Sequence, residues 1–568
     1  MQQIIASLVR DALAAAVAAG EFSLPEVPEP ALERPRDPSH GDWSTNIAMR
    51  SAKVAGVPPR QLAQSIADRI ASHPDVAAVE VAGPGFINIR LSAAALQRVI
   101  AEVRERRLDY ARIDLGGGKK AQVEFVSANP VGPMHVGHGR WAALGDSLAR
   151  VLAHAGYTVE REFYVNDQGV QMDIFAASVA ARYMELLGHR IEFPENGYRG
   201  AYINDIAAEI LKSEGPSWAE RTIEEREAHF KEQAYAAVLE HLKHVLHGMG
   251  VDFDVWFSER TLHGPGANGS PSAIESGIAR LREGGYIFEL DGATWFRSTD
   301  FGDDKDRVLI KADGSYTYFA ADIAYHWNKF HERGFDLVID IWGADHHGYV
   351  PRMKAAVAAL GYPGQLEVVI GQLVNLFRNG EAVRMSKRTG EMVTFEELLD
   401  EVGADAARYF FLRRSTDQAL DFDIGLAKEQ SADNPVYYVQ YAHARICSIL
   451  RKAADAPDAD DVETLAASLV PAGVDLTPLT DDAELALFRK LEEFGEVVEV
   501  AARTLQPHKL TRYAEELAAT FHQFYTVCRV VDSDAPALTA ARLAVVDSTR
   551  LALELVLSLL GVSAPQRM

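Results

Sequence analysis

A short stretch near residue 130 combines residue types that bind phosphates. It runs from Val123 to Arg140 and reads VEFVSANPVGPMHVGHGR. A β-type run is followed by a turn rich in proline and glycine, and a helical pattern begins after His138. The start of such a helix presents free backbone N–H groups and the positive end of the helix dipole. His135 and His138 can add side-chain donors, and Gly137 allows a base or ribose to approach the backbone. The stretch therefore predicts a nucleotide site.

A basic segment about 250 residues downstream strengthens this prediction. Glu381 to Thr394 reads EAVRMSKRTGEMVT, and a lysine on such a loop can contact the β- and γ-phosphates of ATP as charge builds during attack on the α-phosphate. Either motif alone would most often be chance or a solvated turn, so the pair carries the argument. His135 to His138 resembles the HIGH motif of class I aminoacyl-tRNA synthetases, and Arg384-Met385-Ser386-Lys387 resembles their KMSK loop. Arg384 replaces the first lysine of that motif, which keeps the charge but not the chemistry of a lysine.

The wider pattern is similar to that of the arginyl-tRNA synthetases. HGDWSTN, from His40 to Asn46, resembles the additional N-terminal domain of that family, which docks near the tRNA elbow, and the closing LLGVSAPQRM resembles the family's C-terminus. Without the family, Asp42 and Thr45 are read as turn and cap residues. The resemblance covers essentially the whole chain. It implies an arginine–tRNA ligase that uses ATP and Mg²⁺, forms arginyl-adenylate from L-arginine, and transfers arginine to the 3′-terminal ribose of tRNA(Arg).

We expect a multidomain α/β protein, because 568 residues are too many for one core. Residues 1–108 are predicted to form a small α+β N-terminal domain. Residues 115–430 alternate strands and helices, which predicts a Rossmann-like catalytic domain with a doubly wound parallel sheet and a helical insertion at about 189–275. Two of its strands are predicted at Leu337–Ile341 and Val368–Leu373. Residues 431–568 are predicted to form an all-α anticodon-binding bundle.

Binding of a guanidinium group requires a fixed carboxylate with planar or aromatic neighbours. Tyr318 and Asp322, within SYTYFAADIAY, are four residues apart and share one face if the segment is helical. The resemblance implies that these two residues bind the arginine side chain, and that Glu124, Ser127 and Asn129 complete the pocket. Ser127 and Asn129 are expected near the α-amino and carboxylate end. A local cap or ion pair is the alternative role for Asp322.

The polar run after the strand that ends at Ile341 is a further candidate. Asp345 and His346 would lie beside the nucleotide, where they are expected to contact ribose or substrate, although a helix N-cap at Asp345 is an alternative. His346 and His347 together suggest a metal site, but no third ligand has a spacing that fits zinc. We therefore predict no metal held by protein ligands, and Mg²⁺ is expected to arrive with ATP.

Aromatic residues and arginines recur at helical spacing in the C-terminal region. Tyr437, Tyr438, Tyr441 and Arg445 fall in one predicted helix, and Tyr525 falls near the last. Such aromatics are usually core residues, but exposed ones beside arginines can stack on an unpaired anticodon loop. The net charge of −24 counts mildly against RNA binding. It does not exclude it, because phosphate binding depends on local potential.

From the composition we expect a cytoplasmic protein. Cys447 and Cys528 are far apart and form no CxxC motif, which suits a reducing compartment. Charged residues interrupt the apolar C-terminal run, so no membrane span is predicted, and a monomer is expected. Two alternatives stay open, namely a class I synthetase for another amino acid and a non-catalytic tRNA-binding paralogue. The acidic pocket argues against the first, and the intact His135, His138 and Lys387 argue against the second.

Overall fold

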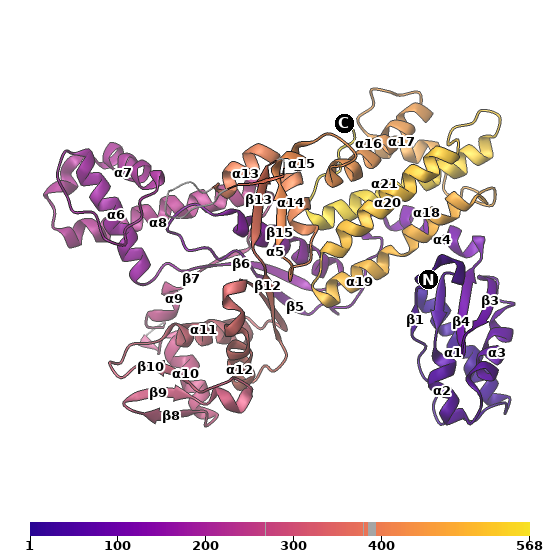
Figure 1. Cartoon of the computed structure of the whole chain (residues 1–568), viewed down its shortest axis with the longest axis horizontal. Coiled ribbons are helices and arrows are strands. Elements are labelled where there is room, and N and C mark those ends of the chain that lie inside the picture. The colour runs from indigo at the N-terminus through magenta and orange to yellow at the C-terminus, as the bar shows by residue number, and fades with distance from the viewer. Residues whose placement is uncertain (267–268, 379, 384–392) are drawn as a thin grey trace.

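The computed structural model of the chain describes residues 1–266, 269–378, 380–383 and 393–568. Arg384, Met385, Ser386 and Lys387 lie outside the described residues. Figure 1 shows an N-terminal unit, a central sheet flanked by helices, and a helical bundle formed by the C-terminal third of the chain. This is the predicted combination of a small α+β unit, a parallel α/β sheet and an all-α bundle.

The N-terminal unit is a four-stranded antiparallel sheet covered by helices. The strands follow the order β1 (Leu32–Glu33), β2 (Trp43–Thr45), β4 (Phe86–Leu91) and β3 (Val76–Ala82). The helices are α1 (Gln2–Ala18), α2 (Ile47–Ala55), α3 (Pro59–Ile70) and α4 (Ala93–Arg106). Helices α2 and α3 pack on the sheet, and α1 packs on α3. Trp43, Ile87 and Ile89 are buried between these layers, because alternate strand residues face the helices.

The central sheet has five strands, all parallel. Their order is β12 (Leu366–Gly371), β11 (Leu337–Gly343), β5 (Lys120–Glu124), β6 (Thr158–Val165) and β7 (Val255–Ser258). The chain order reverses between the neighbouring strands β5 and β11. In open α/β sheets ligands bind in the crevice at the carboxyl ends of the strands beside such a switch point. The topology therefore points to the ends of β5 and β11.

Helices and a small sheet surround this core. Helix α5 (Val136–His154) follows β5, and α6 (Val170–Leu186), α7 (Ala201–Glu214) and α8 (Ile223–Gly248) lie between β6 and β7 in the chain. These three helices pack on one another and extend away from the sheet (Figure 1). A second apolar core lies among α9 (Arg260–His263), α10 (Ala273–Glu283), α11 (Tyr318–Trp327), α12 (Val350–Leu360) and the antiparallel strands β8 (Ile287–Leu290), β9 (Ala293–Phe296) and β10 (Arg307–Ile310).

The strand predicted at Val368–Leu373 is wrong at its end. Strand β12 stops at Gly371, and the chain enters another sheet as β13 (Val374–Arg378), beside β14 (Glu381–Ala382) and β15 (Leu420–Asp423). The backbone of Gln372 explains the break, because its N–H donates to the carbonyl of Thr416 (3.1 Å) and its carbonyl accepts from Arg140 (2.9 Å). These contacts replace the hydrogen bonds to β11.

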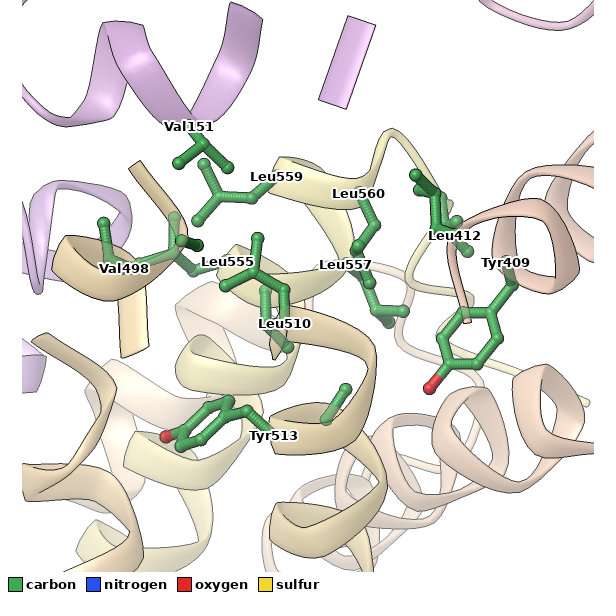
Figure 2. Close-up of a cluster of buried hydrophobic side chains, with 14 of the residues drawn as sticks. Val151, Tyr409, Leu412, Val498, Leu510, Tyr513, Leu555, Leu557, Leu559 and Leu560 are labelled. Carbon is green, nitrogen blue, oxygen red and sulfur yellow. The ribbon is translucent and has the colours of Figure 1, made fainter. Parts of the chain in front are cut away.

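Helices α13 (Phe395–Val402), α14 (Ala404–Leu412) and α15 (Ile424–Lys428) adjoin α5 and the small sheet of β13 and β15. The helices that follow form the bundle, namely α16 (Pro435–Ala453), α17 (Val462–Leu469), α18 (Asp482–Glu492), α19 (Phe494–Thr504), α20 (His508–Val527) and α21 (Pro536–Leu560). Figure 2 shows part of its apolar core, where leucines of α21 meet Leu412 of α14, Val498 of α19 and Leu510 of α20. Helix α21 is buried along most of its length, mainly by apolar residues, with a short buried polar segment at 547–550.

The N-terminal unit contacts the bundle through the apolar packing of α4 on α18 and α21 and through charged groups. Asp42 accepts a hydrogen bond from the backbone of Leu91 (2.7 Å) and another from the guanidinium of Arg489 on α18. Arg34 forms ion pairs with Glu492 and Glu496 and stacks over Trp43, 4.4 Å from the ring centre. The HGDWSTN segment thus contributes more than turn residues, since Asp42 joins the first and last parts of the chain.

Candidate functional site

A cavity of about 580 Å³ opens at the carboxyl ends of β5 and β11, the position that the sheet topology indicates. It is lined by most of the site residues predicted from the sequence, namely Glu124, Ser127, Asn129, His135, His138, Tyr318, Asp322, Asp345 and His346. Gly137 is not among the lining residues. The cavity brings together residues that are more than 200 positions apart in the chain, from both halves of the sheet.

His135 and His138 cap the start of helix α5 reciprocally. The Nδ1 atom of His135 accepts from the backbone N–H of Gly137 (3.1 Å), and Nδ1 of His138 accepts from the N–H of His135 (3.2 Å). The two rings stack with their centres 3.7 Å apart. An Nδ1 atom that accepts a hydrogen bond leaves the ring proton on Nε2. The hydrogen bonds at both Nδ1 atoms therefore fix the two imidazole rings at the helix start.

Gly137 serves this capping geometry. A Cβ atom at Gly137 would lie 2.9 Å from Cε1 and 3.0 Å from Nδ1 of His135. The glycine is therefore needed so that the ring of His135 can fold back onto its own helix. We predicted that Gly137 lets a nucleotide approach the backbone, and the structure adds this internal reason for a glycine.

The loop after β5 has an unusual backbone. Val126 has φ of 68° and Ser127 has φ of 41°, a region that β-branched residues rarely adopt. The Ser127 hydroxyl donates to Oε1 of Glu124 (3.1 Å) and accepts from the backbone N–H of Tyr164 (3.1 Å). The strained turn thus fixes the serine between two neighbouring strands and directs the chain toward Asn129.

A buried lysine joins two carboxylates at the floor of the cavity. Glu124 and Asp340 are paired positions on the neighbouring strands β5 and β11. The Nζ atom of Lys329 lies 2.6 Å from Oε2 of Glu124 and 2.9 Å from Oδ1 of Asp340, and its side chain is fully buried. Like charges on paired strand positions repel each other. Lys329 offsets that repulsion and occupies the oxygen of Glu124 that does not face Ser127.

The pKa values of this cluster follow from burial and from the shared lysine. Burial raises the pKa of Glu124, with Lys329 opposing the shift. Burial also disfavours the charged form of Asp340, but Lys329 and His326 outweigh it and lower the pKa of Asp340 to about 2. The Nε2 atom of His326 lies 2.9 Å from Oδ2 of Asp340, and its Nδ1 lies 2.8 Å from the backbone oxygen of Asp322. The floor of the cavity therefore carries a fixed network of opposite charges.

Asp322 is the carboxylate that faces the cavity with a neutral partner. It is half-buried, and the Tyr349 hydroxyl donates to its Oδ2. Burial raises the pKa of Asp322 to about 6, although the Tyr349 hydrogen bond acts in the opposite direction. A carboxylate with a raised pKa in a cavity favours a cationic ligand, which would restore its charged form.

Three predicted residues lie at the rim. Tyr318 is the first residue of α11 and is 74% exposed. Asp345 and His346 fall within a single 3₁₀ turn, Ala344–Tyr349, and their side chains are mostly exposed and 3.5 Å apart. The alternative of an N-cap at Asp345 is wrong, because Gly343 occupies the cap position of that turn.

Sequence reasoning missed Lys329, His326, Asp340 and Tyr349. A signal was present for two of them, because Asp322, His326 and Lys329 follow one another at spacings of four and three residues, which places them on one helical face. Lys329 extends this face from α11 into a π-helical turn, Asn328–Glu332. Such turns are frequent at functional sites.

The second motif, Arg384 to Lys387, lies outside the described residues, but the chain on its far side returns to the site. Thr394 pairs with His135, and the backbone N–H of Phe395 donates to the carbonyl of Met134 (2.9 Å). Thr394 also caps α13 by accepting from Glu397 N–H (3.1 Å). The segment that follows the motif is thus anchored directly beside the histidines.

Two further structural features bear on function. Among the described residues, no group of three or more His, Cys, Asp or Glu side chains is arranged to hold a metal ion. Likewise, none of the helices in the described ranges is both long and apolar enough for a membrane span.

Comparisons with known proteins identify the family. Residues 3–91 match the arginyl-tRNA synthetase N-terminal domain, residues 102–443 match the class I (R) tRNA synthetase catalytic domain, and residues 439–568 match the DALR anticodon-binding domain. The arginine–tRNA ligase of Heliobacterium modesticaldum is 49% identical, over 99% of this chain and 98% of its own length. That of Listeria monocytogenes is 49% identical over 100% of both chains.

Solved structures agree with this assignment at the level of the fold. Thermus thermophilus arginyl-tRNA synthetase is 22% identical and superposes with a TM-score of 0.74, covering 99% of this chain and 100% of its own. Family models that span all three units, together with full-length relatives at this identity, leave one assignment. The chain belongs to the arginyl-tRNA synthetases, the class I arginine–tRNA ligases.

Proposed function

We propose that the cavity at the ends of β5 and β11 binds L-arginine and ATP side by side and forms arginyl-adenylate. The observation that carries this proposal is the half-buried carboxylate of Asp322 in the same cavity as the two histidines that cap α5. One feature is suited to a cation and the other to an anion. An enzyme that joins arginine to the α-phosphate of ATP needs both within one pocket.

The arginine side chain is assigned to Asp322 and Tyr318. The guanidinium group pairs with the ionised carboxylate of Asp322, and the Tyr318 ring at the rim can close over the planar group. Glu124 is assigned a supporting role, since Lys329 and Ser127 occupy its two oxygens. Ser127 and Asn129 are assigned to the α-amino and carboxylate end, and Asp345 and His346 to the ribose or the substrate at the rim.

ATP is assigned to the start of α5. His135, Gly137 and His138 form the phosphate and adenosine side, at the positive end of the helix dipole of α5. Lys387 and Met385 are assigned to ATP from the following motif, with Ser386 and Arg384 as further catalytic candidates. The anchoring of Thr394 to His135 supports this assignment. Mg²⁺ is expected as the counterion of the phosphates.

Neither step of the reaction requires a nucleophilic side chain, so the main task of the protein is to position the reactants. The arginine carboxylate attacks the α-phosphorus in line, which forms the mixed anhydride and releases pyrophosphate. A hydroxyl of the 3′-terminal ribose of tRNA next attacks the arginyl carbonyl and releases AMP. The cavity favours both steps by holding the reactants in register and by stabilising the charge that develops on the phosphate oxygens.

An aromatic surface of the bundle is assigned to the anticodon loop. Tyr437 and Tyr441 stack on α16 with ring centres 6.0 Å apart, and the Arg445 guanidinium lies 5.1 Å from the Tyr441 ring and 5.2 Å from the Tyr525 ring. Unpaired bases stack on such aromatic and guanidinium planes. In this assignment residues 1–108 and 431–568, which pack on each other, hold tRNA(Arg). We further infer a monomer in the cytoplasm, where the two buried, free cysteines suit a reducing environment.

One assay tests the proposed function. The enzyme is incubated with ATP, total tRNA and each of the twenty amino acids in turn, and both charged tRNA and pyrophosphate are measured. Charging with arginine alone is expected. Charging with another amino acid would indicate a synthetase of different specificity, and tRNA binding without charging would indicate a non-catalytic relative.

A further inference from the structure

The last helix of the bundle ends against the helix that begins at the histidines. The final carbonyl groups of any helix lack partners within the helix. In α21 they are met by side chains from other elements. The Ser147 hydroxyl of α5 donates to the Leu559 carbonyl (2.9 Å), and Nε of Arg408 on α14 donates to the Leu560 carbonyl (3.1 Å). The cap of α21 is therefore built by the catalytic region.

Arg408 is the centre of this junction. Its side chain is fully buried, and its Nη1 atom also donates to the carbonyls of Met249 (3.2 Å) and Gly250 (3.3 Å), at the end of α8. Gly561 ends α21 with φ of 68°, and a Cβ atom there would lie 1.9 Å from Nη2 of Arg408. A glycine at position 561 therefore leaves the space that the Arg408 guanidinium occupies.

The junction continues into α5 through Asp146. Arg408 donates to the buried carboxylate of Asp146, which also pairs with Arg150 (2.7 Å) and Arg161 (3.1 Å). One guanidinium therefore joins α14, the end of α21, the end of α8 and the middle of α5. Lysine could not replace it without loss, because its single nitrogen cannot reach partners in so many directions.

Apolar contacts surround these polar ones. Figure 2 shows Val151 of α5 facing Leu559 of α21, and Leu412 of α14 near Leu560 of α21. Helix α5 runs unbroken from Val136 to His154. A displacement at Asp146 or Val151 is therefore carried along one rigid element to the caps at His135 and His138.

We propose that Arg408 is a positioning residue through which the anticodon-binding bundle sets the position of α5 and thereby of His135 and His138. The inference rests on the proposed function and deepens it, since it identifies how tRNA held by the bundle acts on the adenylate-forming pocket. Arg408 touches no substrate in this assignment. It acts through Asp146 and the carbonyl ends of α21.

The experiment compares two buried arginines. Arg408→Lys keeps the charge beside Asp146 and loses the fork that reaches the carbonyls. Arg451→Lys is the matched control, because Arg451 is also buried and donates to the carbonyls of Ala459 (2.7 Å) and Gln566 (2.9 Å) within the bundle. Ser147→Ala removes one hydroxyl from the same junction and leaves Arg408 intact. Each variant is assayed for arginine-dependent pyrophosphate–ATP exchange at saturating tRNA, for tRNA affinity and for melting temperature.

For Arg408→Lys we expect kcat of exchange to fall about tenfold while the Kd for tRNA changes less than about twofold. Ser147→Ala should lose kcat in the same direction by a smaller factor, and Arg451→Lys should keep it. If Arg408 is only structural, Arg408→Lys and Arg451→Lys should both lose kcat, each by an amount that follows its loss of melting temperature. That result would overturn the proposal. If Arg408→Lys does not fold, Ser147→Ala decides, and an unchanged kcat there overturns it. The wild-type enzyme separately tests the proposed function, which fails if arginine produces no exchange even with tRNA.

Discussion

Replacement of Asp322 by asparagine tests the assignment of the arginine pocket most directly. Asparagine has the same shape and can still accept the hydrogen bond from the Tyr349 hydroxyl, so the fold should be preserved. What it removes is the negative charge opposite the guanidinium. We expect a large increase in the KM for arginine and little change in the KM for ATP.

The size of the effect follows from the environment of the carboxylate. Two opposite charges 4 Å apart attract by about 4 kcal/mol at an effective dielectric constant of about 20, which suits a half-buried group. The dipole of the asparagine amide still provides part of this attraction to the guanidinium. A net loss of about 2–4 kcal/mol remains, which corresponds to an increase of roughly 30- to 1000-fold in the dissociation constant of arginine.

The pH dependence provides an independent signature. The pKa of Asp322 is about 6 in the empty pocket, and arginine requires the ionised form. Wild-type affinity for arginine should therefore be constant above pH 6 and fall about tenfold per pH unit below it. The asparagine variant has no such group, and its weaker affinity should not change over the same range. Isothermal titration with arginine between pH 5 and 8, in the presence of tRNA, measures both curves.

Folding stability should change in the opposite direction. Because the pKa of Asp322 is raised from 3.8 to about 6 on folding, its favourable contribution is complete below pH 3.8 and is lost as the pH rises through 6. At pH 8 the ligand-free Asp322→Asn variant should thus melt at a higher temperature than wild type, and near pH 4 the difference should shrink. Arginine affinity that is unchanged in the variant, or a pH profile that stays as steep as in wild type, would show that Asp322 is structural and that Glu124 is the better candidate.

The other predictions concern ATP, packing and tRNA. Lys387→Ala should lower the rate of adenylate formation by roughly 10²-fold and leave arginine affinity nearly unchanged, so an equal loss of arginine binding in a calorimetric titration would contradict the assignment. Gly139→Ala should destabilise the protein and impair ATP binding, because its Cβ would lie 2.3 Å from the ring of Phe395, and an unchanged melting temperature would mean that this contact gives way at no cost. Pyrophosphate–ATP exchange should be near background without tRNA and strong with it, and deletion of residues 431–568 should abolish the stimulated signal in a protein whose melting curve still shows folding. Robust exchange without any tRNA would show that the pocket is assembled in advance.

Much of the architecture could be predicted because local patterns coincide with local structure. The order of strand, loop and helix around Asn129 is as predicted, although β5 ends at Glu124, before Val126, and α5 begins at Val136 and not after His138. The strand end at Gly371 could not be predicted in this way. Apolar residues continue on both sides of the break at 371–373, and the break depends on Arg140, which is distant in sequence and donates to the carbonyl of Gln372.

The pocket residues could also be predicted only in part from the sequence. Glu124 and Asp322 could be selected from their residue type and from the family resemblance. Their different environments could not, because Glu124 is occupied by Lys329, 205 positions away, whereas Asp322 keeps a neutral partner. Which of two carboxylates faces a ligand is decided by long-range partners, and a single sequence does not contain the distances that would reveal them.

The contact between Asp42 and Arg489 has a consequence for synthesis of the protein. The two residues are 447 positions apart, and a ribosome adds about 5–20 residues per second. The N-terminal unit therefore emerges on the order of 20–90 seconds before Arg489 exists to pair with Asp42. During that time the unit must stay folded and soluble by itself, with Asp42 and Arg34 exposed to water. These charged groups lose nothing in water during the delay, whereas the apolar face of α4 stays uncovered until α18 and α21, on which it packs, have been made.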